Sequence, residues 1–226
     1  MELPQQVRSH GSISEIIRND GRTYQGNLES YFWAIFNHAE NLHNPYHNFR
    51  HLFHTMWLCY DACMFYLRTM SGRQMRTLLI AALFHDFNHT TIRHPDAVNI
   101  KRAIAGLKKY LAPQDKQAFK EIAALMKATE YPYPASSKSL ALPVRILRDA
   151  DAAQTFDDAW IQQVVFGLAK EWEKTPLEIL EIQLGFLRNL KFNTVWAQKL
   201  FPDDTIKEKI AETQELIDLL KKKPER

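Results

Sequence analysis

The chain has 226 residues, a length that fits one domain. Hydrophobic residues make up 46% and charged residues 24%, a balance typical of a soluble globular protein rather than of a disordered or membrane protein. The formal net charge is only +3, and no basic stripe with interleaved aromatic residues occurs. We therefore expect no nucleic-acid partner.

The chain gives no sign of export or of membrane insertion. Residues 1–6 are polar, and the longest apolar run is far shorter than the ~20 residues that cross a bilayer. Cys59 and Cys63 lie four residues apart among apolar neighbours, which is typical of core residues in a reducing compartment. We expect a cytoplasmic protein without a membrane partner. For its assembly we expect a homodimer, because two-fold dimers are the commonest oligomers.

Helical spacing of apolar residues recurs along the whole chain, and no segment alternates long enough to predict a strand. Thr175, Pro176 and Glu178 form a good helix start, with an N-cap, a proline in the first turn and an acidic residue after it. The pattern predicts an all-α fold, one compact multi-helix bundle that forms a single domain over 1–226 with its core at about 28–200. Helices are predicted over 28–43, 48–69, 74–89, 97–111, 115–129, 141–153, 158–172, 176–190, 192–200 and 204–221.

A charged pair interrupts the most apolar of these helices. His85 and Asp86 directly follow the apolar run 78–84. An ionised carboxylate beside an imidazole in such a run costs several kcal/mol unless something compensates it. A bound divalent cation would compensate both side chains. His89 follows one helical turn after His85, so we expect it on the same side.

Two further segments offer ligands. His47 and His51 are four residues apart, which predicts two imidazoles on one helical face that share a site or divide the work around it. A carboxylate can come from the segment 148–153, where Asp149 and Asp151 are both candidates. Either of them can instead form an ion pair with a neighbouring arginine, Arg145 or Arg148.

The pattern His51, His85-Asp86 and Asp151 resembles the defining motif of the HD-domain metal-dependent phosphohydrolase superfamily. The segments Tyr46-His47-Asn48-x-x-His51 and His85-Asp86-x-x-His89 are similar to those of the catalytic domains of class I cyclic nucleotide phosphodiesterases. A third segment, which contains Gln183 and Phe186, looks like the one that holds the purine base in that family.

This resemblance implies a role for each matching residue. His51, His85, Asp86 and Asp151 would bind the first of two divalent metal ions, and Asp86 would bridge to a second ion held mainly by waters, with His89 hydrogen-bonding nearby. His47 would be the general acid that protonates the leaving alkoxide, while a metal-bound hydroxide attacks phosphorus. Tyr46, Gln183 and Phe186 would bind the substrate. Ligands of this kind suit Zn, Fe or Mn at the first site and Mg or Mn at the second.

The expected activity is hydrolysis of a phosphodiester bond in a nucleotide, a cyclic nucleotide included. Two alternatives stay open: a phosphomonoesterase that acts on nucleoside monophosphates, and a non-catalytic HD module that senses a nucleotide or docks a partner. Gln183 and Phe186 also fit plain core positions of a helix. The chain departs from the phosphodiesterase pattern after His89, where Thr90-Thr91 replace Pro-Gly, and its nearest match to the family's acidic residue there is Asp96.

Overall fold

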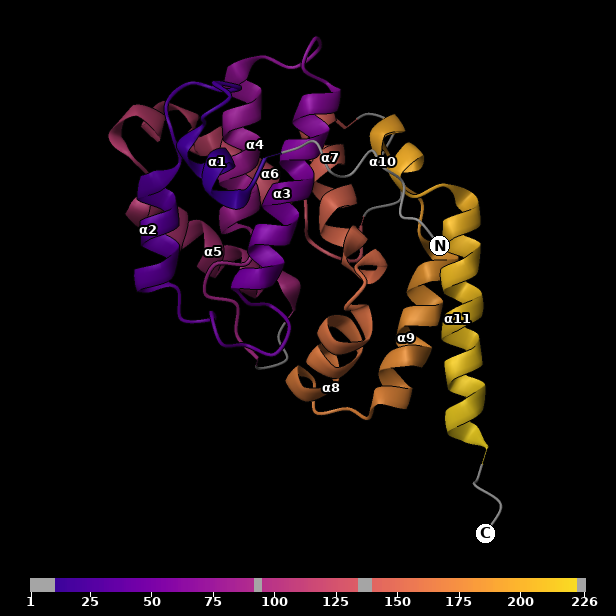
Figure 1. Ribbon diagram of the computed structural model, residues 1–226. Coiled ribbons are helices and arrows are strands. Elements are labelled where there is room, and N and C mark those ends of the chain that lie inside the picture. Colours follow the sequence, from indigo (N-terminus) through magenta and orange to yellow (C-terminus); the bar gives the residue numbers. More distant parts are fainter. Residues whose placement is uncertain (1–10, 92–94, 134–139, 223–226) are drawn as a thin grey trace.

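The computed structural model describes residues 11–91, 95–133 and 140–222, and the regular structure within these ranges is entirely helical (Figure 1). The predicted all-α bundle is confirmed. Its α-helices are α1 (Ile13–Arg18), α2 (Glu29–His38), α3 (Phe49–Phe65), α4 (Gly72–Phe84), α5 (Asp96–Tyr110), α6 (Phe119–Lys127), α7 (Leu142–Ala152), α8 (Gly167–Glu171), α9 (Pro176–Asn189), α10 (Val195–Leu200) and α11 (Asp203–Lys221). Two 3₁₀-helices, η2 (Pro113–Ala118) and η3 (Ala153–Phe156), and a π-helix, η4 (Ile161–Phe166), complete the chain order.

Three predicted helices end four or five residues earlier than the apolar pattern indicated. The helix predicted over 28–43 stops at His38, because the backbone of Ala39 is extended and an asparagine-rich loop follows. The helix predicted over 48–69 stops at Phe65. The helix predicted over 74–89 stops at Phe84, and Asn88 beyond it adopts a left-handed backbone with φ of 60°. His89 is therefore not one helical turn from His85, and a turn positions it instead.

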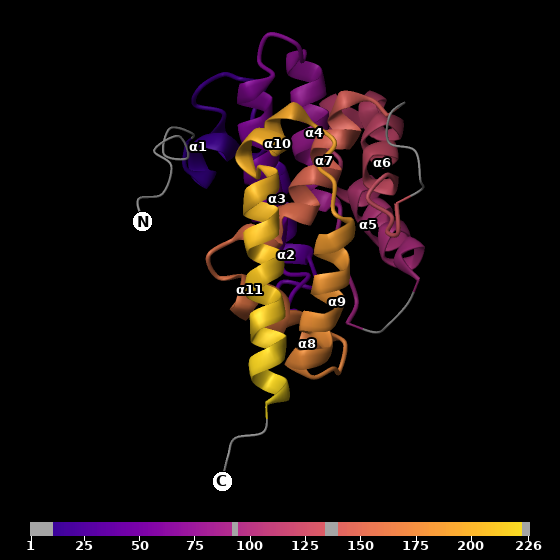
Figure 2. The same ribbon diagram turned by 90° about the vertical axis from the view of Figure 1, so that its right-hand side faces the viewer.

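The buried apolar side chains form two clusters. The larger cluster is built by helices α1 to α7 and by α10. The smaller cluster joins η4, α8, α9 and α11, and its members include Trp160, Ile179 and Ile217. Figures 1 and 2 show α9 and α11 side by side, with α8 beside the lower part of α9. Tyr46 packs against the smaller cluster from the loop that precedes α3, so this loop lies where the two clusters meet.

A buried ion pair that is not part of the candidate site stabilises the larger cluster. Arg76 donates to both carboxylate oxygens of Asp115 at 2.8 and 2.7 Å, and the hydroxyl of Tyr31 donates to the same carboxylate. Burial alone would raise the pKa of Asp115, but the hydrogen bonds from Arg76 and Tyr31 outweigh it and lower that pKa below its usual value. This group of side chains ties α2, α4 and η2 together.

The two cysteines lie where the sequence predicted them, in the core. Cys59 and Cys63 are buried in the larger cluster as free thiols, as expected of core residues. None of the helices in the described ranges is both long and apolar enough to cross a membrane.

Candidate active site

The N-cap of α3 determines where His47 and His51 lie. Asn48 is the N-cap, and its side-chain oxygen accepts hydrogen bonds from the backbone of Arg50 at 2.8 Å and of His51 at 3.3 Å. His51 therefore lies in the first turn, whereas His47 precedes the helix. The prediction that both imidazoles share one helical face is wrong for this reason, although their ring centroids are 5.8 Å apart.

The four predicted metal ligands converge on one point from three helix ends. His85 is the C-cap of α4, Asp86 follows it, and Asp151 lies in the last turn of α7. The Nε2 atoms of His51 and His85 are 3.1 Å apart. Asp86 Oδ2 lies 3.2 and 3.3 Å from these two nitrogens, and Asp151 Oδ1 lies 3.1 and 3.5 Å from them. His51, His85 and Asp151 form a group that could hold a metal ion, and Asp86 adjoins it.

The hydrogen bonds on the far side of each ring fix which nitrogen faces this point. His85 Nδ1 donates to the carbonyl of Ala82 at 2.7 Å, and His51 Nδ1 pairs with the side-chain oxygen of Gln154. In the neutral rings, both Nε2 atoms then present lone pairs to each other and to two carboxylates. Atoms bound about 2.1 Å from one cation are about 3.0–3.4 Å from each other, close to the spacings seen here. The donor set therefore fits a divalent cation.

Without a cation, protons take its place. Burial lowers the pKa of His51, but hydrogen bonds with Asp151 and Asp86 outweigh it and raise this pKa to about 9. The pKa of His85 is also raised, because the two carboxylates overcome its burial. Conversely, the imidazoles hold the pKa values of Asp86 and Asp151 below the usual range against the effect of burial. The centre thus favours positive charge strongly, whether protons or a metal ion supply it.

Asp149, the other acidic candidate in this segment, has a different environment. Its carboxylate accepts hydrogen bonds from the backbone and side chains of Asn193 and Thr194, at 2.7 to 3.1 Å. Thr194 is the N-cap of α10. Asp149 therefore anchors the start of α10, and of the two aspartates Asp151 is the one that lies beside His51 and His85.

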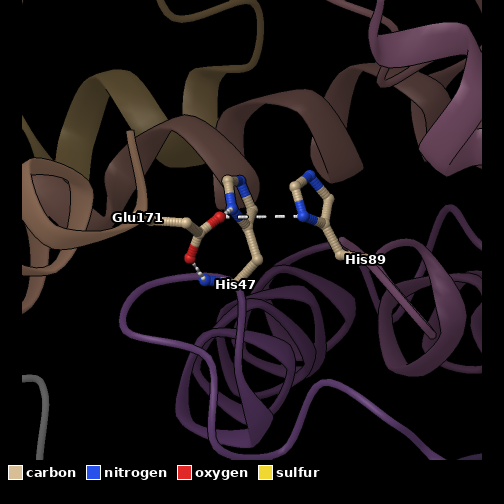
Figure 3. A group of neighbouring side chains, drawn as sticks. All are labelled: His47, His89 and Glu171. Carbon is tan, nitrogen blue, oxygen red and sulfur yellow. Dashed lines mark hydrogen bonds and ion pairs between the residues drawn. The ribbon is translucent and has the colours of Figure 1, made fainter. Parts of the chain in front are cut away.

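His47 is held by a glutamate that the sequence did not point to. Glu171, at the end of α8, accepts hydrogen bonds from the backbone of Tyr46 at 3.0 Å and of His47 at 3.1 Å, and its other oxygen pairs with His47 Nδ1 (Figure 3). The side chain of Glu171 is fully buried. Burial raises its pKa, but the hydrogen bonds from His47 and the backbone outweigh it and lower the pKa overall. Glu171 therefore stays ionised and fixes His47 Nδ1 as a donor.

A glycine allows this close approach. A Cβ atom at Gly167 would lie only 2.8 Å from the carbonyl oxygen of Pro45 and 3.3 Å from Tyr46 Cβ. Real Cβ atoms almost never come so close to a carbonyl oxygen, so Gly167 lets the first turn of α8 pack directly on the loop before α3. Glu171 then reaches His47 from the other end of this short helix.

His89 stacks on His47, with ring centroids 3.7 Å apart and an angle of 15° (Figure 3). Asn99 Nδ2 donates to His89 Nε2 at 2.9 Å. Burial, together with the neighbouring His47, lowers the pKa of His89 to about 4, so this ring is neutral at pH 7. His47, His89 and Glu171 form another group whose ligand atoms are close enough for a metal ion. However, ring lone pairs lie in the ring planes, and two stacked rings cannot direct theirs at one ion, so we assign no metal to this group.

His47 and three of the predicted metal ligands, His51, Asp86 and Asp151, line a pocket of about 660 Å³, within the range of small-molecule sites. Tyr46, Gln183 and Phe186 also line it, so the structure brings all the predicted substrate-binding residues to one cavity, together with Asp96. Gln183 is buried, and its side-chain oxygen has no hydrogen-bond partner among the described residues. Phe186 meets the ring of Tyr131 edge-on, with centroids 6.3 Å apart.

Comparison with known proteins gives a likeness in fold. No protein-family model matches the chain, and no curated protein sequence matches it either. Among solved structures, the chain is similar to LmjPDEB1 in complex with IBMX, with a TM-score of 0.61 over 91% of this chain and 85% of that one. The two sequences are 16% identical, so this likeness shows a shared all-α fold.

Proposed function

We propose that this chain is a metal-dependent phosphohydrolase that cleaves a phosphodiester bond in a nucleotide. The observation that carries the proposal is the convergence of His51, His85, Asp86 and Asp151. Of these, His51, Asp86 and Asp151 line one pocket together with the carboxylate-bound His47. The similar fold of LmjPDEB1, a phosphodiesterase by name, supports it.

In this proposal the four converging side chains would hold one divalent cation, Zn, Fe or Mn. Asp86 would also help to hold a second ion, Mg or Mn. When bound, such ions supply the Lewis acidity that activates water and offsets the charge of a phosphate group. The chain itself fixes both imidazole rings through Ala82 and Gln154, so their Nε2 atoms are preorganised for the metal.

His47 is the proposed general acid. Glu171 binds its Nδ1, which leaves Nε2 as the ring nitrogen that can deliver a proton to the leaving oxygen. The ionised carboxylate of Glu171 favours the ring orientation and the tautomer that this transfer requires. His89 supports the ring from its other face by stacking and stays neutral.

The part of the pocket lined by α9 is the proposed base site. Gln183, whose buried side-chain oxygen has no partner among the described residues, lines this part of the pocket and is the residue proposed to hydrogen-bond a base edge. Phe186 offers an aromatic face, and base–aromatic stacking contributes about 1–3 kcal/mol. A nucleotide could thus bind with its phosphate at the proposed metal ligands and its base at α9.

A substrate panel tests the proposal. The purified protein, loaded with Mn²⁺ or Mg²⁺, is assayed on cyclic nucleotides, linear and cyclic dinucleotides, nucleoside monophosphates and bis(4-nitrophenyl) phosphate. We expect turnover of a phosphodiester that disappears in Asp86→Ala and persists in His43→Ala, an exposed histidine outside the site. Turnover confined to monophosphates would make the chain a phosphomonoesterase. Nucleotide binding without turnover would make it a sensing module, and either result would overturn the proposal.

A further inference from the structure

The loop that carries His47 is attached to the metal ligands by asparagine side chains. This loop, residues 39–48, connects α2 to α3, and the turn that it faces, residues 85–90, follows α4. Four asparagines lie in these two segments, and we call them the asparagine cluster: Asn41, Asn44, Asn48 and Asn88.

Asn41 is the buried member that contacts both segments. Its side-chain nitrogen donates to the backbone carbonyl of His47 at 2.7 Å and to that of Asp86 at 2.9 Å. Its side-chain oxygen accepts from the backbone nitrogen of Asn88 at 2.9 Å. The residue is only 1% exposed, so these three bonds are shielded from water. Both amide hydrogens and the amide oxygen are therefore used, and each bond is to the backbone of a site segment.

The other asparagines add bonds of the same kind. Asn88 Oδ1 accepts from the backbone of Glu40 at 2.9 Å, in the reverse direction across the two segments. Asn44 Nδ2 donates to the carbonyl of His89 at 2.9 Å. Asn88 has a left-handed backbone, a conformation that asparagine adopts more readily than most residues. The two segments are thus joined by side-chain to backbone bonds that only a few residue types can make.

From this geometry we infer that Asn41 is a positioning residue, which sets the place of His47 relative to the metal-binding carboxylate Asp86; the inference rests on the proposed function. The side-chain amide of Asn41 binds the backbone carbonyls of both His47 and Asp86. If this amide is lost or displaced, the proposed acid His47 therefore moves relative to the proposed metal ligand Asp86. A misplacement of about 1 Å in a reacting group lowers turnover by about 100-fold. Glu171 orients the ring of His47, whereas Asn41 fixes the backbone that carries this ring.

The test compares two phosphodiesters with different leaving groups. A nucleotide with an alkoxide leaving group needs the general acid, whereas bis(4-nitrophenyl) phosphate has a good leaving group and needs it little. For Asn41→Ala we expect kcat to fall about 10- to 100-fold on the nucleotide and less than about 3-fold on the aryl ester. Asn41→Asp keeps the size of the side chain and its acceptor oxygen but loses both hydrogen-bond donors, so its kcat should fall in the same way as that of Asn41→Ala. It replaces Asn41→Ala in the test if that variant does not fold. Asn37→Ala, an exposed asparagine on α2, is the matched control and should change neither rate.

A double-mutant cycle shows whether Asn41 acts through His47. In the His47→Ala background, Asn41→Ala should lower kcat on the nucleotide by less than about 3-fold, because the acid that it places is already absent. Equal losses on both substrates, no loss, or an additive double variant would each overturn the inference and leave the proposed phosphohydrolase activity intact.

A measurement without turnover separates this inference from the proposed function. In ¹⁵N-histidine NMR spectra, Asn41→Ala should shift the ring nitrogens of His47 and leave those of His38, an exposed residue at the end of α2, unchanged. Unchanged His47 signals would overturn the inference even if the wild-type protein hydrolyses no substrate.

Discussion

The Nε2 atoms of His51 and His85 face each other at 3.1 Å, and each ring already uses its Nδ1 to bond an oxygen. Two neutral rings in this position repel each other through their lone pairs, so the pair requires a positive charge between or on them. In the metal-free protein, protons supply that charge, since the pKa of His51 is raised to about 9 and that of His85 is also raised. Metal ions and protons therefore compete for one place.

We predict that metal binding releases protons. At pH 7 the metal-free rings are protonated, so one to two protons should leave for each metal ion that binds at the four ligands. Affinity should increase as the pH rises toward about 9, because His51 then loses its proton before the metal binds. Titration calorimetry with Mn²⁺ in buffers of different ionisation enthalpy measures this release. Affinity that does not change between pH 6 and pH 9 would contradict the prediction.

The same groups make the stability of the metal-free protein depend on pH. The folded-state pKa of His51 is raised, so its contribution to the free energy of unfolding is fully present below about pH 6.5 and is lost as the pH rises through about 9. In a chelator, the midpoint of thermal unfolding should therefore fall between pH 6.5 and pH 9. Mn²⁺ should reverse this fall, because the metal binds better once the protons have left. The His51→Gln variant should show a smaller fall, because His85, whose pKa is also raised, remains.

Replacing Glu171 tests the proposed acid without touching the metal ligands. Glu171→Gln keeps the shape and an oxygen for the backbone bonds of Tyr46 and His47, but it removes the negative charge beside the ring. We expect kcat on a nucleotide phosphodiester to fall about 100-fold, with metal content unchanged. The matched control is Glu173→Gln, an exposed glutamate two residues later, which should act like the wild type. Loss of metal in Glu171→Gln would show that Glu171 belongs to the metal centre.

Variants of the proposed base site should affect binding more than chemistry. Gln183→Ala and Phe186→Ala each remove one contact to the base, and we expect KM for a nucleotide to rise about 10-fold in each. The kinetics with bis(4-nitrophenyl) phosphate, which has no nucleobase, should change little. Gln162→Ala, on the exposed side of η4, is the control. If KM stays the same in both variants, Gln183 and Phe186 are core residues, and the base binds elsewhere.

Stability away from the site can be tested at the buried ion pair. Asp115→Ala leaves the guanidinium of Arg76 buried without its carboxylate, and we expect the free energy of unfolding to fall by about 3–5 kcal/mol. Glu121→Ala breaks the exposed pair with Arg73, where the loss should be at most about 1 kcal/mol. Urea unfolding measures both. Because the folded-state pKa of Asp115 is lowered, the contribution of its carboxylate to the free energy of unfolding is present above about pH 4 and is lost as the pH falls through the folded value. Asp115→Ala lacks this contribution at every pH, whereas Glu121→Ala loses it in acid. The difference in stability between the two variants should therefore become smaller in acid.

Apolar periodicity predicted the helical architecture well because most helices bury one face. It failed at the ends of α2 and α4, where the apolar pattern continues but polar bonds take the chain into turns. At the end of α4, Asn88 adopts a left-handed backbone and Asn41 binds two backbone groups. These bonds come from another part of the chain, so the local sequence at 85–89 does not contain them.

Residue spacing pointed to His85 and Asp86 and left two pairs of candidates open, His47 or His51 and Asp149 or Asp151. The choice of His51 and Asp151 came from the resemblance to the phosphodiesterase motifs. Their convergence adds support, and their roles stay predictions. Glu171 carried no comparable signal: it is one of two glutamates that flank Trp172, and its partner His47 is 124 residues away. Only the fold shows that Glu171 is buried while Glu173 is exposed.

The pocket is walled by both hydrophobic clusters, and each brings different chemistry. The larger cluster carries the proposed cation ligands on α3, α4 and α7, whereas Glu171, Gln183 and Phe186 belong to α8 and α9 in the smaller one. If the proposed function holds, metal retention and nucleotide choice would depend on separate halves of the molecule. Substitutions in α8, α9 or the supporting α11 would then change the preferred base and keep the cation centre as it is.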